Sequence, residues 1–165
     1  MGSRCLGPAE AAETGREFPG FTQADFQRLP LPAGRPVIEP GNGYTLVGVP
    51  TNVYADAEPV TLGTSLLGFP VQVRATPSRY EWEFGDGSGH GPTSDPGSPY
   101  PELSITHEYA AAGAYPVTLV TYYVGEYSVA GGPWLPIVGE AAVRSDPVTV
   151  EALAGRNQLV AGASG

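Results

Sequence analysis

The chain has 165 residues and a formal net charge of −9, and all eight of its basic residues are scattered arginines. Nucleic acids and anionic membrane surfaces are bound by concentrated basic patches, so this composition disfavours both, and we expect no nucleic-acid partner. The single cysteine, Cys5, excludes an intramolecular disulfide and a cysteine-rich metal site. No stretch approaches the roughly 20 apolar residues of a membrane helix, and we expect no membrane insertion.

The N-terminal part predicts little regular structure. Residues 1–17 are polar, carry no secretory signal pattern and are expected to form a flexible leader or a marginal short helix. Thr22 can cap a helix, and Asp25 completes a capping-box-like pattern three residues later. One or two helical turns are therefore predicted before Pro30 ends them.

Short apolar and β-branched runs, separated by glycine and proline, fill residues 35–68. Such runs predict short strands, and the prolines confine several of them to sheet edges. We interpret this region as an N-terminal β extension that caps the main domain or adds an edge to it.

A pair of strands is predicted next. Apolar and polar residues alternate over 69–76, which is typical of a half-buried strand, and Pro77-Ser78 is expected to make a turn. The following strand, residues 80–84, places three aromatic side chains on one face and Glu81 and Glu83 on the other. It stops at Gly85-Asp86-Gly87, where the glycines allow the positive φ of a sharp exit.

The rest of the chain predicts one long hairpin. Residues 88–102 are dense in glycine, proline and serine and are expected to form a mobile surface loop. Residues 114–129 make the longest strand-like run, and a turn at 131–133 leads to a returning run over 134–143. The small, polar residues 155–165 are interpreted as a tail.

Two motifs in this order resemble those of polycystic-kidney-disease (PKD) domains. Residues 82–88, Trp-Glu-Phe-Gly-Asp-Gly-Ser, resemble the signature W-D-F-G-D-G-S, with Glu83 in place of the usual Asp. Residues 106–119 resemble the H-x-Y motif and the G-x-Y-x-V-x-L strand that follows it. The resemblance covers about 70–151, and it departs from the family pattern after Gly87 and after Leu119, where this chain is longer.

The resemblance implies an all-β, immunoglobulin-like β-sandwich of PKD type, here with an N-terminal extension and an elongated C-terminal hairpin. The implied division is a leader at 1–34, the β extension at 35–68, the PKD-like sandwich at 69–154 and the tail at 155–165. It also implies an extracellular or cell-surface location, as in secreted proteins of high-GC Gram-positive bacteria. We expect a monomer. The expected structural motif residues are Trp82, Phe84, Gly85, Asp86, Gly87, His107, Tyr109, Gly113 and Tyr115.

Asp86 and His107 form the most suggestive polar pair, because the two motifs should lie close together. One interpretation is structural, with Asp86 holding its own turn and His107 seating the next strand. A catalytic interpretation needs an activated nucleophile beside the histidine. Ser88 is near in sequence, but no nucleophile elbow or third motif supports it, so we expect no enzyme activity.

No cofactor or metal is expected. His90, Asp95 and Glu102 lie in the predicted loop, but they lack the ligand spacing of zinc or calcium sites. A weak calcium site in residues 88–102 stays open at this point. Glu81 and Glu83, two residues apart on a strand, are expected to belong to a solvated sheet face.

Four aromatic residues of the long hairpin admit two interpretations. Both faces of residues 120–124 are apolar or aromatic, so either the chain covers both faces or one face is a contact surface. We hypothesise a contact surface for a protein or glycan at the hairpin tip. Its residues are Tyr122, Tyr123, Tyr127 and Trp134.

The sequence thus favours a non-catalytic extracellular or cell-surface module that binds or spaces, and that mediates protein or glycan contacts. The alternative is an accessory domain of a secreted protease or glycan hydrolase whose catalytic part lies outside this chain.

Overall fold

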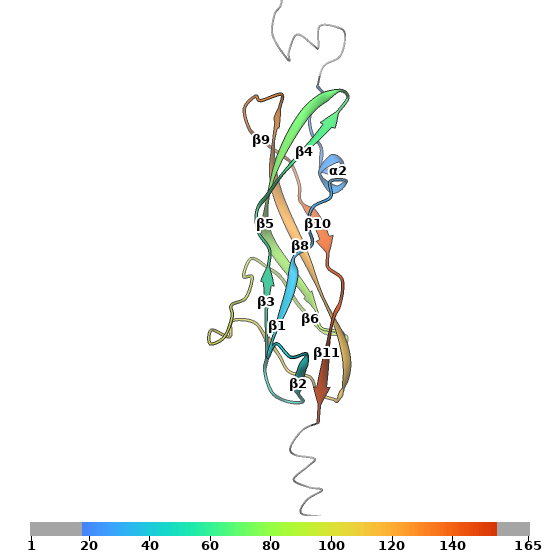
Figure 1. Ribbon diagram of the computed structural model, residues 1–165, viewed down its shortest axis with the longest axis vertical. Coiled ribbons are helices and arrows are strands. Elements are labelled where there is room, and N and C mark those ends of the chain that lie inside the picture. Colours follow the sequence, from blue (N-terminus) through green and yellow to red (C-terminus); the bar gives the residue numbers. More distant parts are fainter. Residues whose placement is uncertain (1–17, 155–165) are drawn as a thin grey trace, which may run out of the picture. The chain divides into compact units, whose positions relative to one another are not determined.

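A computed structural model describes residues 18–154 (Figure 1). Its regular structure is almost entirely β. In chain order the elements are α2 (Gln23–Gln27), β1 (Arg35–Glu39), β2 (Tyr44–Leu46), β3 (Thr51–Asp56), β4 (Val60–Leu66), β5 (Phe69–Glu83), β6 (Gly89–Thr93), β7 (Thr106–His107), β8 (Gly113–Val129), β9 (Leu135–Pro136), β10 (Ala141–Arg144) and β11 (Val148–Leu153).

The described chain divides into two compact units, which are best taken one at a time. The sandwich unit comprises Pro32–Glu58, Ser78–Tyr122 and the described residues from Val143 onward. The hairpin unit comprises the described residues up to Leu31, Pro59–Pro77 and Tyr123–Ala142. Strands β5 and β8 are long, and each contributes some of its residues to the sandwich unit and the rest to the hairpin unit.

The sandwich unit contains two sheets. One has the order β1-β3-β7, and β1 and β3 run side by side in Figure 1, with Val37 opposite Tyr54 in antiparallel register. The other has the order β2-β11-β8-β5, and β6 pairs with the end of β5. The all-β, immunoglobulin-like sandwich predicted from the sequence is confirmed.

The core of the sandwich unit is aromatic and β-branched. Trp82 and Phe84 of the β5 end are 1% and 2% exposed, and Leu119 of β8 is fully buried. Val53 of β3 packs into the same cluster from the other sheet. Burying such a side chain contributes roughly 1.5–3 kcal/mol, so this cluster is the main stabilising term of the sandwich.

The hairpin unit is built on β4 and the first part of β5, paired antiparallel from Val60 opposite Ala75 to Leu66 opposite Phe69. Helix α2 supplies Phe26, which is fully buried. A Cβ on Gly125 of β8 would lie 2.8 Å from the Phe26 ring, so the glycine makes room for that ring.

Several local predictions can be compared with the structure. The predicted short helix is α2, and Thr22 and Asp25 form its capping box. The predicted long strand is β8, which leads into a return by β9 and β10. The leader at 1–17, Cys5 and the tail at 155–165 lie outside the described residues, and the four-part division of the chain stays a prediction.

The turn predicted at Pro77-Ser78 is wrong, because β5 runs unbroken through both residues. Its pairing with β4 stops at Ala75, which lies opposite Val60 at the start of β4, and its pairing with β6 starts only at Tyr80, opposite Thr93 at the end of β6. Proline has no backbone N–H for a ladder, and at Pro77 neither of these neighbouring strands needs one. The buried face nevertheless changes here, from odd-numbered residues before Pro77 to even-numbered residues after it.

Residues 35–68 supply β1 and β3 of the sandwich's second sheet, and Val53 of β3 packs into the core. One further expectation differs from the structure. The region 88–102, expected to be loop throughout, begins with strand β6, which continues the ladder of β5.

Gly85 and Gly87, which follow β5, provide a matched test of backbone packing. Both have a φ close to +90°, where an alanine is strained by roughly 1–2 kcal/mol. A Cβ at Gly85 would lie 2.6 Å from the Pro116 carbonyl oxygen, whereas one at Gly87 would meet nothing within 4 Å. In urea denaturation we therefore expect Gly85→Ala to lose at least about 1 kcal/mol more than Gly87→Ala. Equal losses would show that the contact with Pro116 is unimportant.

Candidate functional site

The motif turn after β5 is organised by the Asp86 carboxylate. Oδ1 accepts a hydrogen bond from the Ser88 backbone N–H, at 3.0 Å, and another from the Ser88 hydroxyl. Oδ2 lies 2.7 Å from Nε2 of His107 on β7. Because β7 belongs to the other sheet, the Asp86 side chain links the two sheets of the sandwich.

Aromatic contacts hold His107 in place. Its ring stacks on Phe84 with a centroid distance of 4.2 Å, and Tyr109 packs edge-on against it. The Tyr109 hydroxyl, which is buried, donates a hydrogen bond of 2.8 Å to the Phe84 carbonyl. Tyr115 in turn stacks on Tyr109 at 4.3 Å and donates to the Ala111 carbonyl. The structure therefore brings together the sequence-predicted motif residues around one turn.

The geometry of Ser88, His107 and Asp86 is not that of a catalytic triad. The Ser88 hydroxyl lies 3.3 Å from Nε2 of His107, which is the same nitrogen that contacts Asp86. In a triad the serine and the carboxylate bind opposite nitrogens of the imidazole. The nitrogen that faces the serine acts as the base, and the N–H of the other nitrogen donates to the carboxylate, which orients the ring. Here the serine hydroxyl donates to the carboxylate itself, which does not activate it as a nucleophile.

Burial raises the pKa of Asp86, but the hydrogen bonds from Ser88 and His107 outweigh this and lower the pKa to about 2. The carboxylate is thus held in its charged form, as an acceptor for the turn. This is the chemistry of a structural anchor, since a general acid needs a raised pKa.

The outer face of β5 is polar and internally paired. Glu83 forms an ion pair with Arg144 of β10 and accepts a hydrogen bond from the Thr118 hydroxyl at 3.1 Å. These hydrogen bonds lower the pKa of Glu83. Glu81 accepts a hydrogen bond of 2.8 Å from the Tyr122 hydroxyl. Sequence reasoning placed both carboxylates on this face and missed their partners, which come from distant strands.

The four aromatics assigned to a hairpin contact surface do not share one exposed face. Tyr123 is 1% exposed and belongs to the interior, which corrects its assignment. The Tyr122 hydroxyl is bonded to Glu81, and the Arg79 guanidinium lies 4.5 Å from its ring centroid.

The other two aromatics belong to the hairpin unit and also have internal contacts. Tyr127 packs against Phe18 and Phe21. Trp134 is half-buried, with the Arg74 guanidinium 3.8 Å from its ring centroid. For Tyr122, Tyr127 and Trp134 a contact role stays a hypothesis.

The three candidate ligands of the loop are not gathered into a cation site. Asp95 caps its own turn by accepting the Gly97 N–H at 2.9 Å. Among the described residues, no three His, Cys, Asp or Glu side chains form a group that could hold a metal ion.

Comparison with known families identifies the core of the sandwich. The PKD domain family model matches residues 43–121, which include both motifs and the turn between them. Over these residues the chain is similar to PKD domains. PKD domains are non-catalytic, immunoglobulin-like modules that occur in extracellular proteins, generally for adhesion or spacing. No curated protein and no solved structure matches the chain. No helix in residues 18–154 has the length and apolarity to span a membrane.

The anchor role of Asp86 has a pH signature. Its pKa is lowered in the folded state, so its stabilising contribution is present above about pH 4 and is lost as the pH falls toward about 2. We expect Asp86→Ala to lose about 1–3 kcal/mol in urea denaturation at pH 7, because the turn donors lose their acceptor. At pH 2–3 the difference in free energy of unfolding between Asp86→Ala and wild type should become smaller. A gap that is independent of pH would argue against an ionised anchor, and Glu58→Ala, at an exposed acid, serves as the control.

The Ser88–His107 geometry predicts no hydrolytic turnover. Purified chain is expected to leave ester, peptide and glycoside substrates unchanged at the level of a buffer blank. Turnover that is abolished by both Ser88→Ala and His107→Ala would overturn the structural interpretation. Turnover that survives both variants indicates a contaminating enzyme.

Proposed function

We propose that this chain is a non-catalytic binding or spacer module of an extracellular or cell-surface protein, and that it mediates protein or glycan contacts. The main support for this proposal is the hydrogen bonding of the polar groups in the motif. Asp86, Ser88 and His107 bond to one another and to the turn, so their polar groups serve as one another's hydrogen-bond partners. Together with the PKD match at 43–121, this favours a scaffold whose surface, rather than a catalytic centre, carries the function.

The net charge of −9 supports this proposal, because it keeps such a module soluble and unattached to nucleic acid. The same module can also act as the accessory domain of a secreted protease or glycan hydrolase. The gene sequence that flanks the chain distinguishes the two roles, because only the accessory role requires a catalytic domain in the same protein.

Surface binding can be measured with fluorescently labelled chain and intact cells of the organism that encodes it. We expect saturable binding that unlabelled chain displaces. Loss of binding after protease treatment of the cells identifies a protein contact, and loss after glycosidase treatment identifies a glycan contact. Binding that never saturates, or no binding at all, contradicts a contact role. A disulfide-free immunoglobulin-like domain of unrelated sequence is the negative control.

The hairpin hypothesis makes its own prediction in this assay. Interface hot spots favour tryptophan, and truncating one costs about 2 kcal/mol or more, which is roughly a 30-fold loss of affinity. On this hypothesis Trp134→Ala weakens cell binding by that amount while the denaturation midpoint barely moves. A large fall in the midpoint, with binding reduced only in proportion to the folded fraction, would instead assign Trp134 to internal packing with Arg74.

A further inference from the structure

A pocket of about 430 Å³ lies in the sandwich unit, away from the motif turn. It is built from the end of β1, the start of β3 and the β6–β7 loop, residues 94–105, which stands out from the ribbon beside β3 in Figure 1. Its lining residues are Glu39, Pro40, Gly41, Pro50, Asn52, Tyr100 and Leu103. Sequence reasoning did not find this pocket, because its three segments are far apart in the chain.

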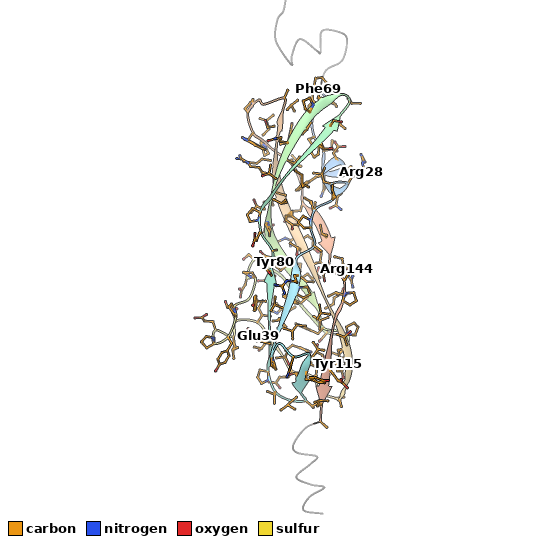
Figure 2. All side chains as sticks on the ribbon, viewed as in Figure 1. Arg28, Glu39, Phe69, Tyr80, Tyr115 and Arg144 are labelled. Carbon is orange, nitrogen blue, oxygen red and sulfur yellow. The ribbon has the colours of Figure 1, made fainter. Side chains whose placement is uncertain are left out.

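The loop is anchored to the strands by polar contacts. Oε1 of Glu39 accepts hydrogen bonds from the Tyr100 N–H, at 2.8 Å, and from Nδ2 of Asn52, at 2.9 Å. The same Asn52 amide donates to the Ser98 carbonyl at 2.8 Å. Figure 2 shows Glu39 on the side of this unit from which the loop projects. The backbone at Tyr100 is therefore held at a fixed place.

The side chains on this anchored backbone are left in solvent. Tyr100 is 73% exposed and Leu103 is 48% exposed. Together with Pro40 and Pro50 they give the pocket an apolar, aromatic wall. A large aromatic side chain on a fixed loop, beside a hollow, loses little conformational freedom on binding and presents a wide contact area.

The polar groups of the pocket are acceptors. Asn52 is 3% exposed, and its Oδ1 has no hydrogen-bond partner among the described residues. This oxygen is itself buried, so it does not face a ligand in the pocket. Glu39 supplies a carboxylate to the pocket wall, and the β6–β7 loop carries Asp95 and Glu102 but no arginine or lysine. The pocket therefore selects for a proton donor and for positive charge.

We propose that this pocket binds a basic side chain, arginine or lysine, presented by a peptide segment of a protein partner. The guanidinium or ammonium group meets the Glu39 carboxylate and stacks on the Tyr100 ring, and the aliphatic stem packs against Leu103 and the prolines. Charge complementarity favours this occupant over a neutral glycan, since the chain carries a net charge of −9. The inference rests on the proposed binding function and specifies its partner.

The test is a titration of the full ¹⁵N-labelled chain, followed by NMR, with the peptide acetyl-(Gly-Arg)₃-amide. Acetyl-(Gly-Gln)₃-amide is the uncharged match, and chitotetraose is the glycan probe. We expect the arginine peptide to shift the backbone amides of Gly41, Asn52, Tyr100 and Leu103, and to bind more weakly as salt is raised. The glutamine peptide and chitotetraose should leave these amides in place.

Two variants localise the binding. Tyr100→Ala removes the exposed ring, and Glu39→Gln keeps the Oε1 acceptor while removing the charge. Each is expected to weaken arginine-peptide binding by about fivefold or more. Tyr44→Ala is the matched control, because Tyr44 on β2 is 48% exposed and does not line the pocket. If Glu39→Gln fails to fold, Tyr100→Ala still decides the question.

Three results would overturn the inference: no shift at the pocket amides, equal shifts with the glutamine peptide, or unchanged affinity in Tyr100→Ala. Shifts caused at the same amides by chitotetraose alone would replace the basic partner with a glycan. These failures are separable from failure of the proposed function. If wild type binds cells and Tyr100→Ala binds them equally well, the proposed binding function is supported and the role of the pocket is rejected. If wild type does not bind cells, the proposed function itself is rejected.

Discussion

The hydrogen bond from the Tyr109 hydroxyl to the Phe84 carbonyl is the buried polar contact that fixes how the two sheets meet at the motif turn. Phe84 follows β5 in one sheet, and Tyr109 follows β7 of the other, so a single buried bond of 2.8 Å joins them. The chain leaves β5 immediately afterwards through the Gly85–Gly87 turn, and the Tyr109 hydroxyl supplies the hydrogen-bond donor for the Phe84 carbonyl just before that turn. A buried carbonyl left unpaired costs about 1–3 kcal/mol.

Around this bond the contributions differ in size. Asp86 and His107 are about one fifth exposed at the side chain, so water competes with their hydrogen bond and its net contribution to stability is modest. Trp82 and Tyr109 are each 1% exposed, and the apolar area that they bury outweighs any single polar contact. Burial therefore supplies most of the stability, and the polar contacts determine where the turn goes and which strand faces which. The same division explains why the motif is rich in histidine, serine and aspartate without being a catalytic centre.

The sequence alone predicted what depends on local pattern. Alternation over residues 80–84 placed Trp82 and Phe84 in the core, and the capping pattern at Thr22 placed the helix. It failed where neighbouring strands decide the outcome. Pro77 looks like a turn residue until the pairing of β5 with β4 is seen to stop at Ala75, and Tyr123 looks like a surface residue until its burial is known. The pocket beside Tyr100 lay beyond sequence reasoning, since no short-range pattern links residues 39, 52 and 100.

The central claim is that the PKD motif residues serve to join the two sheets. Tyr109→Phe tests it most directly, because it removes one hydroxyl and leaves the ring that packs against His107 and Tyr115. The free energy of unfolding in urea at pH 7 should fall by about 1–3 kcal/mol, with the dependence on urea concentration unchanged. A loss below about 0.3 kcal/mol would contradict the claim, since the Phe84 carbonyl would then not need the partner that the structure gives it.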